Sequence, residues 1–398
     1  MMQRRQWGQR ALQLGAAWSV ANVLAPLAAQ TDALPQGQGN APMRVGRTRS
    51  IRTLAQAAQQ CRPGQRIEVD AGDYLADVAV WEHDDVNVRA VGGRVRLLAQ
   101  GAAAEGKGIW VVRANRMQVQ GLDFEGCVVP SRNGAGIRFE RGSLLLRDCA
   151  FRLNEMGLLT NNDARAVLVV QNCEFGHNMR PDGHNHNLYV GAIARLSVSG
   201  SYFHHARTGH LLKSRAALNH IFYNRLTDEA GGSASYELEF PNGGVSYVVG
   251  NLIEQNQETD NAFLVSVGAE AYTWPRNEIH LVNNTLVNLL AQGGDFLRVM
   301  PGAQNIRALN NLLVGPGGFD LSGQGDIRNN FKAEAGDFAN LPAHDVRLQS
   351  GSPLVGRAVQ SAAANGQNLT PQREYVHPRA TRAVTASTHN PGAMQSLA

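Results

Sequence analysis

Apolar and polar positions repeat along the chain in eight short segments between Gly121 and Leu313, at steps of 23 to 33 residues. The first positions of the segments are Gly121, Asp148, Asn172, Gly200, Tyr223, Gly250, Asn283 and Asn310. The fourth positions are all apolar, and they are Phe124, Phe151, Phe175, Phe203, Leu226, Ile253, Leu286 and Leu313. A period of roughly 20 to 50 residues is typical of stacked units that cannot bury their apolar faces alone.

One unit reads as a strand, a bend and a second strand. Residues 245–249 are β-branched and aromatic, Gly250 and Asn251 form the bend, and Leu252 and Ile253 continue as a strand. Coils of this kind stack in parallel at about 4.8 Å, and the crossover rule makes their turn right-handed. The pattern therefore predicts an all-β fold, a single-stranded right-handed parallel β-helix.

The second position of the later segments is asparagine, at Asn224, Asn251, Asn284 and Asn311. In a stack these side chains fall in one column, and each amide finds its partner one coil away. We therefore interpret them as a structural ladder and not as a site.

Both ends of the chain differ from the repeat. Arg4, Arg5 and Arg10 precede a weakly apolar run over 11–29 that is too polar to span a membrane. We expect residues 1–29 to be an export signal, for which the adjacent Arg4 and Arg5 suggest the twin-arginine route, and 30–47 to be a flexible leader. The β-helix domain then covers 48–398, with a short amphipathic helix near residues 51–58 capping its start and a C-terminal tail wrapping its last coil.

Charge gives no indication of a nucleic-acid partner. The full chain carries +4, and removal of the three arginines of the export signal leaves a nearly neutral chain. No other segment is apolar enough to span a membrane. We expect a monomer that is periplasmic or extracellular and that binds a polysaccharide.

Two of the four cysteines occupy second positions of adjacent coils. Cys149 and Cys173 would lie about one strand spacing apart, which is within reach of a disulfide, although two small buried thiols in a stack fit equally well. Cys61 and Cys127 have no such partner, and no Cys-x-x-Cys or His/Cys grouping indicates zinc.

Polar residues are densest on three successive coils. The candidate residues are His184, His186, Asn187, Tyr189, His205, Arg207, His210, Lys213, Arg215, Tyr236, Glu237, Glu239 and Trp274. Counting back from the repeat positions places Asn187, His210 and Glu237 on one strand face. Alternation along the strand sends Lys213 and Arg215 outward.

A groove along a β-helix suits a polymer, and a uronate-containing glycan can be cut by β-elimination. The reaction needs a base, a group that neutralises the carboxylate, and an acid for the leaving oxygen. Candidates for the base are Lys213, His184, His186 and His210; for the neutraliser, Arg215 or Arg207; for the acid, Tyr189 or Tyr236. His205, Glu237, Glu239 and Trp274 are candidates for substrate binding.

Two other chemistries stay open at this point. Glu237 and Glu239 could act in hydrolysis. Asn187, His210 and Glu237 could hold a divalent metal such as Ca²⁺, although hard cations prefer more oxygen ligands.

The chain resembles the pectin-lyase-like superfamily of right-handed β-helix proteins over roughly residues 48–395. The first coil at 63–74 and the terminal segments at 348–354 and 390–394 carry this resemblance. Lys213-Ser214, with Asn219, Ile221 and Asn224, is similar to the lysine-serine coil of calcium-dependent alginate lyases and chondroitinase B. That resemblance implies Lys213 as the base. The assisting arginine of the next coil is absent here, and Ala206 and Thr208 replace the acidic metal ligands.

These observations favour an exported polysaccharide lyase acting on a uronate-containing glycan. The alternatives are a non-catalytic carbohydrate-binding or surface β-helix protein, and a glycoside hydrolase or epimerase on the same scaffold. The pattern does not distinguish them, because the fold hosts many activities.

Overall fold

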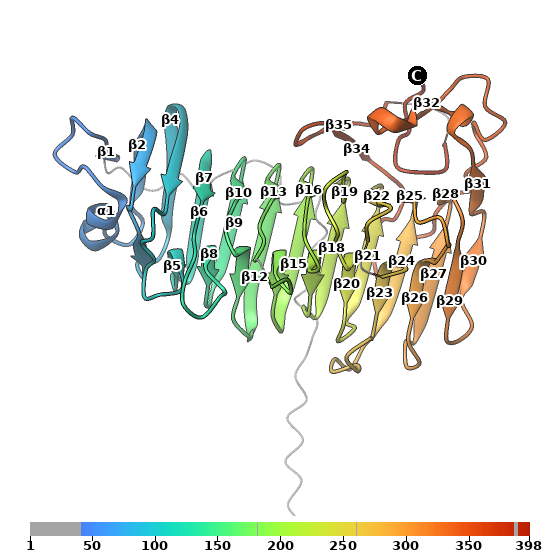
Figure 1. The fold of residues 1–398 in the computed structure, drawn as a ribbon, viewed down its shortest axis with the longest axis horizontal. Helices are drawn as coiled ribbons and strands as arrows, with labels where there is room; N and C mark the ends of the chain where they lie inside the picture. The colour runs from blue at the N-terminus through green and yellow to red at the C-terminus, as the bar shows by residue number, and fades with distance from the viewer. Residues whose placement is uncertain (1–40, 181, 260, 386–388) are drawn as a thin grey trace, which may run out of the picture.

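The computed structural model describes residues 41–180, 182–259, 261–385 and 389–398 as a parallel β-helix whose coils stack along the long axis of the molecule (Figure 1). The predicted all-β, right-handed solenoid is confirmed. The first coils contribute the single strands β1 (Met43–Val45), β2 (Arg66–Leu75) and β4 (Val86–Leu98) to one sheet of 21 strands, each later coil contributes two strands to it, and ten further strands form a second sheet.

The larger sheet contains the strands on both sides of the predicted bend. They are β1 (Met43–Val45), β2 (Arg66–Leu75), β4 (Val86–Leu98), β6 (Arg116–Gln120), β7 (Leu122–Glu125), β9 (Ser143–Arg147), β10 (Ala150–Arg152), β12 (Asp163–Gln171), β13 (Glu174–Gly176), β15 (Ile193–Ser199), β16 (Tyr202–His204), β18 (Leu218–Phe222), β19 (Arg225–Thr227), β21 (Val245–Val249), β22 (Leu252–Gln255), β24 (Glu278–Val282), β25 (Thr285–Asn288), β27 (Asn305–Leu309), β28 (Leu312–Val314), β30 (Asp326–Arg328) and β31 (Phe331–Ala333).

The second sheet forms the opposite wall of the coil. Its strands are β3 (Ala79–Trp81), β5 (Gly108–Val112), β8 (Ala135–Phe139), β11 (Met156–Thr160), β14 (His186–Val190), β17 (His210–Ser214), β20 (Tyr236–Phe240), β23 (Phe263–Val267), β26 (Asp295–Val299) and β29 (Gly318–Leu321). The C-terminal part adds η3 (Ala335–Asp337), β32 (Phe338–Asn340), η4 (Leu341–Ala343), β33 (Asp345–Leu348), β34 (Arg373–Val376) and β35 (Ala380–Ala383).

The bend between the two strands of the larger sheet has a left-handed backbone. All eight predicted first positions have a positive φ, between 51° at Asp148 and 81° at Gly121. Glycine and asparagine tolerate this conformation best, which explains why the repeat begins with them. Tyr223 adopts it as well, with φ at 57°.

Apolar fourth positions fill the interior. Phe124, Phe151, Phe175 and Phe203 are fully buried, and their rings stack coil on coil with centroids 4.6 to 5.0 Å apart. Parallel pairing in register places the same position of each coil above the last, so a periodic sequence becomes a continuous core.

The asparagine ladder is confirmed and is one coil longer than expected. The Asn224 side chain and backbone N–H both donate to Oδ1 of Asn251, at 3.0 and 2.9 Å. The pattern repeats through Asn284 and Asn311 and ends at Asn330. Earlier in the same column Cys149 and Cys173 stack without a disulfide, and all four cysteines are buried free thiols within the described part of the chain.

Helix α1 (Leu54–Gln60) covers the open end of the first coil, as expected of a cap. The Thr53 hydroxyl accepts the Gln56 N–H at 3.1 Å, and the helix buries Leu54, Ala57 and Ala58. The predicted leader ends too late, because Met43–Val45 form β1 and pair in parallel with β2. The segment 1–29, expected to be an export signal, and residues 30–40 of the expected leader lie outside the described residues.

The C-terminal segment returns along the outside of the larger sheet, over the later coils (Figure 1). Leu369 and Ala364 pack on Tyr247 and its neighbours, and the Asn283 amide donates to the Asn390 carbonyl at 2.9 Å. This segment therefore covers the larger sheet and leaves the second sheet free. None of the described helices has the length and apolar character required to cross a membrane.

We expect Asn251→Ala to lower the free energy of unfolding by about 2–4 kcal/mol, because two donors of Asn224 lose their buried acceptor. Urea unfolding followed by circular dichroism measures this. The exposed amide of Gln360 supplies the control, and Gln360→Ala should change stability by less than about 0.5 kcal/mol. Equal effects of the two substitutions would contradict a structural ladder.

Acid should destabilise the fold through buried histidines. Burial, assisted by the charge of Arg195, lowers the pKa of His220 from its ordinary 6.5 to about 4. Between those pH values the unfolded chain binds a proton that the folded chain does not, so stability is present in full above about pH 6.5 and falls toward pH 4. His220→Phe, which keeps the stacking on Tyr247, should flatten the decline of the melting temperature over this window. An unchanged pH profile would contradict a buried neutral imidazole.

Candidate functional site

The outer face of the second sheet carries the candidate site, because its strands place two polar columns side by side. In β17, Leu211 and Leu212 are both buried in the core, whereas His210 and Lys213 both contact the outward carboxylate of Glu239. The first and fourth residues of the strand therefore share the outer face. This departure from strict alternation occurs without a register shift, because β14 and β20 pair with β17 residue for residue.

The first column is aromatic. His186, His210 and Tyr236 are paired in register on β14, β17 and β20, with ring centroids 4.5 and 5.0 Å apart. The His210 backbone N–H donates to Nδ1 of His186 at 3.1 Å. That Nδ1 is therefore unprotonated, and the proton of a neutral His186 lies on Nε2.

Both imidazoles are neutral near pH 7. Burial lowers the pKa of His186 to about 3, and the charge of Lys213 adds to the effect. Burial also lowers the pKa of His210 well below its ordinary value, with His186 and Lys213 contributing. A neutral imidazole serves as a hydrogen-bond donor and acceptor at once.

The second column is charged. Tyr189, Lys213 and Glu239 are paired in register, and Lys213 Nζ lies 2.9 Å from Glu239 and 2.8 Å from Glu270. Burial raises the pKa of Glu239, although the lysine opposes the shift. Burial alone would also raise the pKa of Glu270, but hydrogen bonds from Lys213 and Arg215 lower it.

Arg215 connects this network to a phenol. Its Nη1 donates to the Tyr189 hydroxyl at 2.6 Å, while Nη2 pairs with Glu270. Trp274 packs at the back, with its indole N–H donating to the Arg215 carbonyl at 2.9 Å. Contacts with Tyr189, Glu270 and Trp274 thus fix the position of Arg215, and its guanidinium contacts the Tyr189 hydroxyl.

An open hollow of about 610 Å³ lies beside the two columns. Its lining is cationic and amide-rich, and it consists of Arg132, Asn133, Arg138, Met156, Leu159, Thr160, Asn161, Asn162, Arg180, His184, His186 and Tyr189. Arg132 and Arg180 both pair with Asp182, at 2.6 and 2.9 Å. No carboxylate appears among these lining residues.

Arg138 differs from the other two arginines. Its Nε donates to the Asn161 side chain at 3.0 Å, but among the described residues no carboxylate lies within ion-pair distance of it. Burial lowers its pKa, and the more distant charge of Glu140 opposes that shift only in part, so the desolvation of the guanidinium is incompletely compensated. An anionic group entering the hollow would supply that partner.

Two predicted site residues lie inside the coil and not on its surface. Asn187 and Glu237 are fully buried, and the paired residues are His186, His210 and Tyr236. The prediction that Asn187, His210 and Glu237 share a face is therefore wrong by one residue. The cause is the connection from β17 to β18, which is one residue shorter than those of the adjacent coils.

Glu237 is also separated from Glu239. Both its oxygens lack a hydrogen-bond partner among the described residues, and burial raises its pKa well above the ordinary range, with Asp228 adding to the shift. A neutral acid inside the core cannot bind substrate at the surface, nor join His210 at a metal. The expected roles of Glu237 in substrate binding, in hydrolysis with Glu239 and in metal binding are therefore wrong.

The remaining predicted residues divide between the hollow and its surroundings. His184, His186 and Tyr189 line it, and His210, Lys213, Arg215, Tyr236, Glu239 and Trp274 support it from the adjoining coils. His205 lies beside His177 and His204, and Arg207 is exposed.

Sequence reasoning missed Arg138, Arg180 and Glu270. Arg138 lies in the same column as Tyr189, two coils earlier, so a search of equivalent positions along the repeat could have found it. Glu270 follows β23 in a loop, and nothing in the repeat indicates that this loop folds back on Lys213.

The fold and the polar columns on one outer face place the protein in the class of parallel β-helix proteins. The structure is similar to the crystal structure of pectate lyase Pel9A, with a TM-score of 0.59 and 13% identity, over 90% of this chain and 97% of that chain. At this identity the similarity establishes the fold alone, and the resemblance to the pectin-lyase-like fold is confirmed at that level. No family model and no curated protein matches the sequence.

Removal of Lys213 alone should destabilise the protein. Lys213→Met leaves the buried Glu239 without its cation, and the loss of one partner of a buried ion pair costs about 3–5 kcal/mol. The double variant Lys213→Met/Glu239→Gln should recover most of that loss, as measured by denaturant unfolding. Wild-type stability in Lys213→Met would contradict the buried pair.

Proposed function

We propose that the protein is an exported polysaccharide lyase that cleaves a uronate-containing glycan by β-elimination at the hollow beside β14. The single observation that carries the proposal is Arg138, a desolvated guanidinium without an anionic partner in a cavity lined by cations. Cations in a confined site attract and orient a carboxylate. A neutral sugar would supply no anionic partner for the Arg138 guanidinium.

Neutralising the uronate carboxylate makes the neighbouring proton more acidic, which is the first requirement of the reaction. Arg138 supplies a guanidinium for one carboxylate oxygen. His186, which lines the hollow and carries its proton on Nε2, supplies a donor for the other. Together the two groups stabilise the negative charge that develops on the uronate carboxylate as the proton leaves.

Proton transfer fits Tyr189. The Arg215 guanidinium donates to its hydroxyl at 2.6 Å, and a positive donor at that distance stabilises the negative charge left on the oxygen when the hydroxyl proton passes to solvent. The phenolate removes the proton at C5 of the uronate, the electron pair forms the C4–C5 double bond, and the bond from C4 to the glycosidic oxygen breaks. The phenol then returns the proton to that leaving oxygen.

Lys213 fits a positioning role better than the role of base. Two carboxylates contact its ammonium group, and a base must first lose that proton. In this arrangement Lys213 and Arg215 share Glu270, so the lysine fixes the arginine that acts on Tyr189. His210 and Tyr236 hold His186 in its orientation by stacking.

Calcium does not fit the hollow. Ca²⁺ takes about six to eight oxygen ligands, among them carboxylates, whereas the lining offers three arginines and two histidines. The proposed reaction therefore uses side chains alone to neutralise the substrate. Export, to the periplasm or the cell exterior, rests on the sequence of residues 1–29.

Elimination creates an unsaturated uronate that absorbs ultraviolet light, so incubation with a panel of uronate polysaccharides tests the reaction directly. Tyr189→Phe should reduce the rate by about 10²–10⁴-fold, the usual contribution of a positioned acid or base. Tyr74→Phe on β2, which removes a phenol elsewhere in the solenoid, should retain the wild-type rate. Arg138→Met should weaken glycan binding as well as turnover.

Other outcomes distinguish the alternatives. New reducing ends without ultraviolet absorbance would indicate hydrolysis, with the carboxylates of Glu239 and Glu270, which both contact Lys213, as the candidate groups. Exchange of the C5 proton with solvent without cleavage would indicate an epimerase. Binding that requires Arg138 but yields no product would indicate a non-catalytic carbohydrate-binding protein.

A further inference from the structure

We propose that His177, His204 and His205 form a binding site for a divalent transition-metal ion, zinc being the best fit, that joins two successive coils. The three side chains each offer a ring nitrogen, and these atoms all lie within 4.8 Å of one another. The site is independent of the proposed lyase chemistry, because none of the three residues lines the hollow beside β14.

The backbone brings the three histidines to one corner of the solenoid. His177 follows β13, and His204 and His205 lie at the end of β16, which pairs with β13 in register. His177 and His205 have left-handed backbones, with φ of 55° and 48°. This conformation at the same position of two coils stacks their rings, with centroids 4.3 Å apart.

Gly176 makes room for the third ring. It is the register partner of His204, and a Cβ at this position would overlap the His204 imidazole. The glycine thus lets His204 lie across the neighbouring coil, nearly perpendicular to both other rings, at 82° and 88°. Rings in different planes present nitrogens from different directions, as tetrahedral coordination requires.

The distances suit zinc after a small adjustment. Nδ1 of His204 and Nδ1 of His205 are 2.6 Å apart, whereas bonds of about 2.0–2.1 Å to a tetrahedral ion place two nitrogens about 3.3 Å apart. A movement of less than about 1 Å by the half-exposed His205 ring therefore accommodates the ion. Three imidazoles leave the fourth position for water, and imidazole nitrogen selects Zn²⁺, Ni²⁺ or Cu²⁺ over Ca²⁺.

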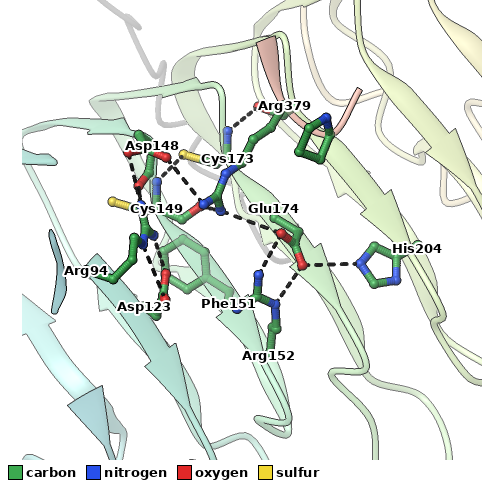
Figure 2. A network of polar contacts seen from close by, with 12 residues as sticks. Arg94, Asp123, Asp148, Cys149, Phe151, Arg152, Cys173, Glu174, His204 and Arg379 are labelled. Atoms are coloured by element: carbon green, nitrogen blue, oxygen red, sulfur yellow. Dashed lines mark hydrogen bonds and ion pairs between the residues drawn. The ribbon is translucent and has the colours of Figure 1, made fainter. Parts of the chain in front are cut away.

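A carboxylate stands behind the buried ligand. Nε2 of His204 faces Glu174 at 3.6 Å, and Figure 2 shows the ring directed at that carboxylate. Nε2 is buried and has no hydrogen-bond partner at shorter range among the described residues. Glu174 is fixed by two bonds from Arg152, at 2.6 and 2.7 Å. A carboxylate behind a ligating histidine is the usual means of orienting the ring.

Zinc binding to the full-length, untagged protein tests the proposal, with a chromophoric chelator as competitor. We expect one Zn²⁺ per chain, an increase of the melting temperature with zinc, and tetrahedral visible absorption when Co²⁺ replaces it. His205→Ala and His177→Ala should each weaken zinc binding by at least about 100-fold. Glu174→Gln should weaken it by about 10–100-fold.

Controls separate a lost ligand from a lost fold. His205 and His177 are half-exposed, so the metal-free melting temperatures of their alanine variants should match that of the wild type. His83→Ala, between β3 and β4, should keep full zinc affinity. The proposal is overturned if one equivalent of Zn²⁺ or Co²⁺ does not bind, or if the His177→Ala/His205→Ala double variant binds zinc as tightly as the wild type.

Discussion

Backbone hydrogen bonding between parallel coils in register is the interaction on which the rest of the structure depends. It fixes the spacing of about 4.8 Å at which equivalent positions follow one another, and so turns every repeated residue into a column. The stacked phenylalanines, the asparagine ladder and the aromatic column of His186, His210 and Tyr236 have this one cause. A solenoid assembles a site from successive coils in the same way as it assembles a core.

The same register explains how much of the fold the sequence could predict. Positions that recur in successive coils, such as the bend at Asn283 and the column beginning at Asn224, follow from the repeat and its residue types, because a left-handed bend and an amide ladder each require particular residues. The cap formed by α1 follows from helical spacing and the need to cover an open end. The predicted end of the leader was wrong at β1, because a strand of three residues among glycines and prolines is too short to show a periodic pattern in the sequence.

The site was harder to predict because it depends on local departures from the repeat. Two adjacent leucines of β17 both point into the core, so strict alternation does not predict which residues of this strand lie on its outer face. In addition, the connection that follows β17 is one residue shorter than its neighbours, so His210 does not lie in the column of Asn187 and Glu237. Side chains such as Glu270 reach the site from a loop. Two carboxylates contact Lys213, which favours a positioning role over the predicted role of base. The spacing of residues along the chain does not indicate such contacts.

A crystal structure of the Tyr189→Phe variant with a uronate oligosaccharide tests the central claim most directly, which is that the hollow beside β14 receives an acidic sugar for elimination. The account predicts a carboxylate bound by Arg138 and the Nε2–H of His186, with C5 of that sugar facing residue 189. A sugar bound with its carboxylate directed away from Arg138, or at another face of the solenoid, would contradict it.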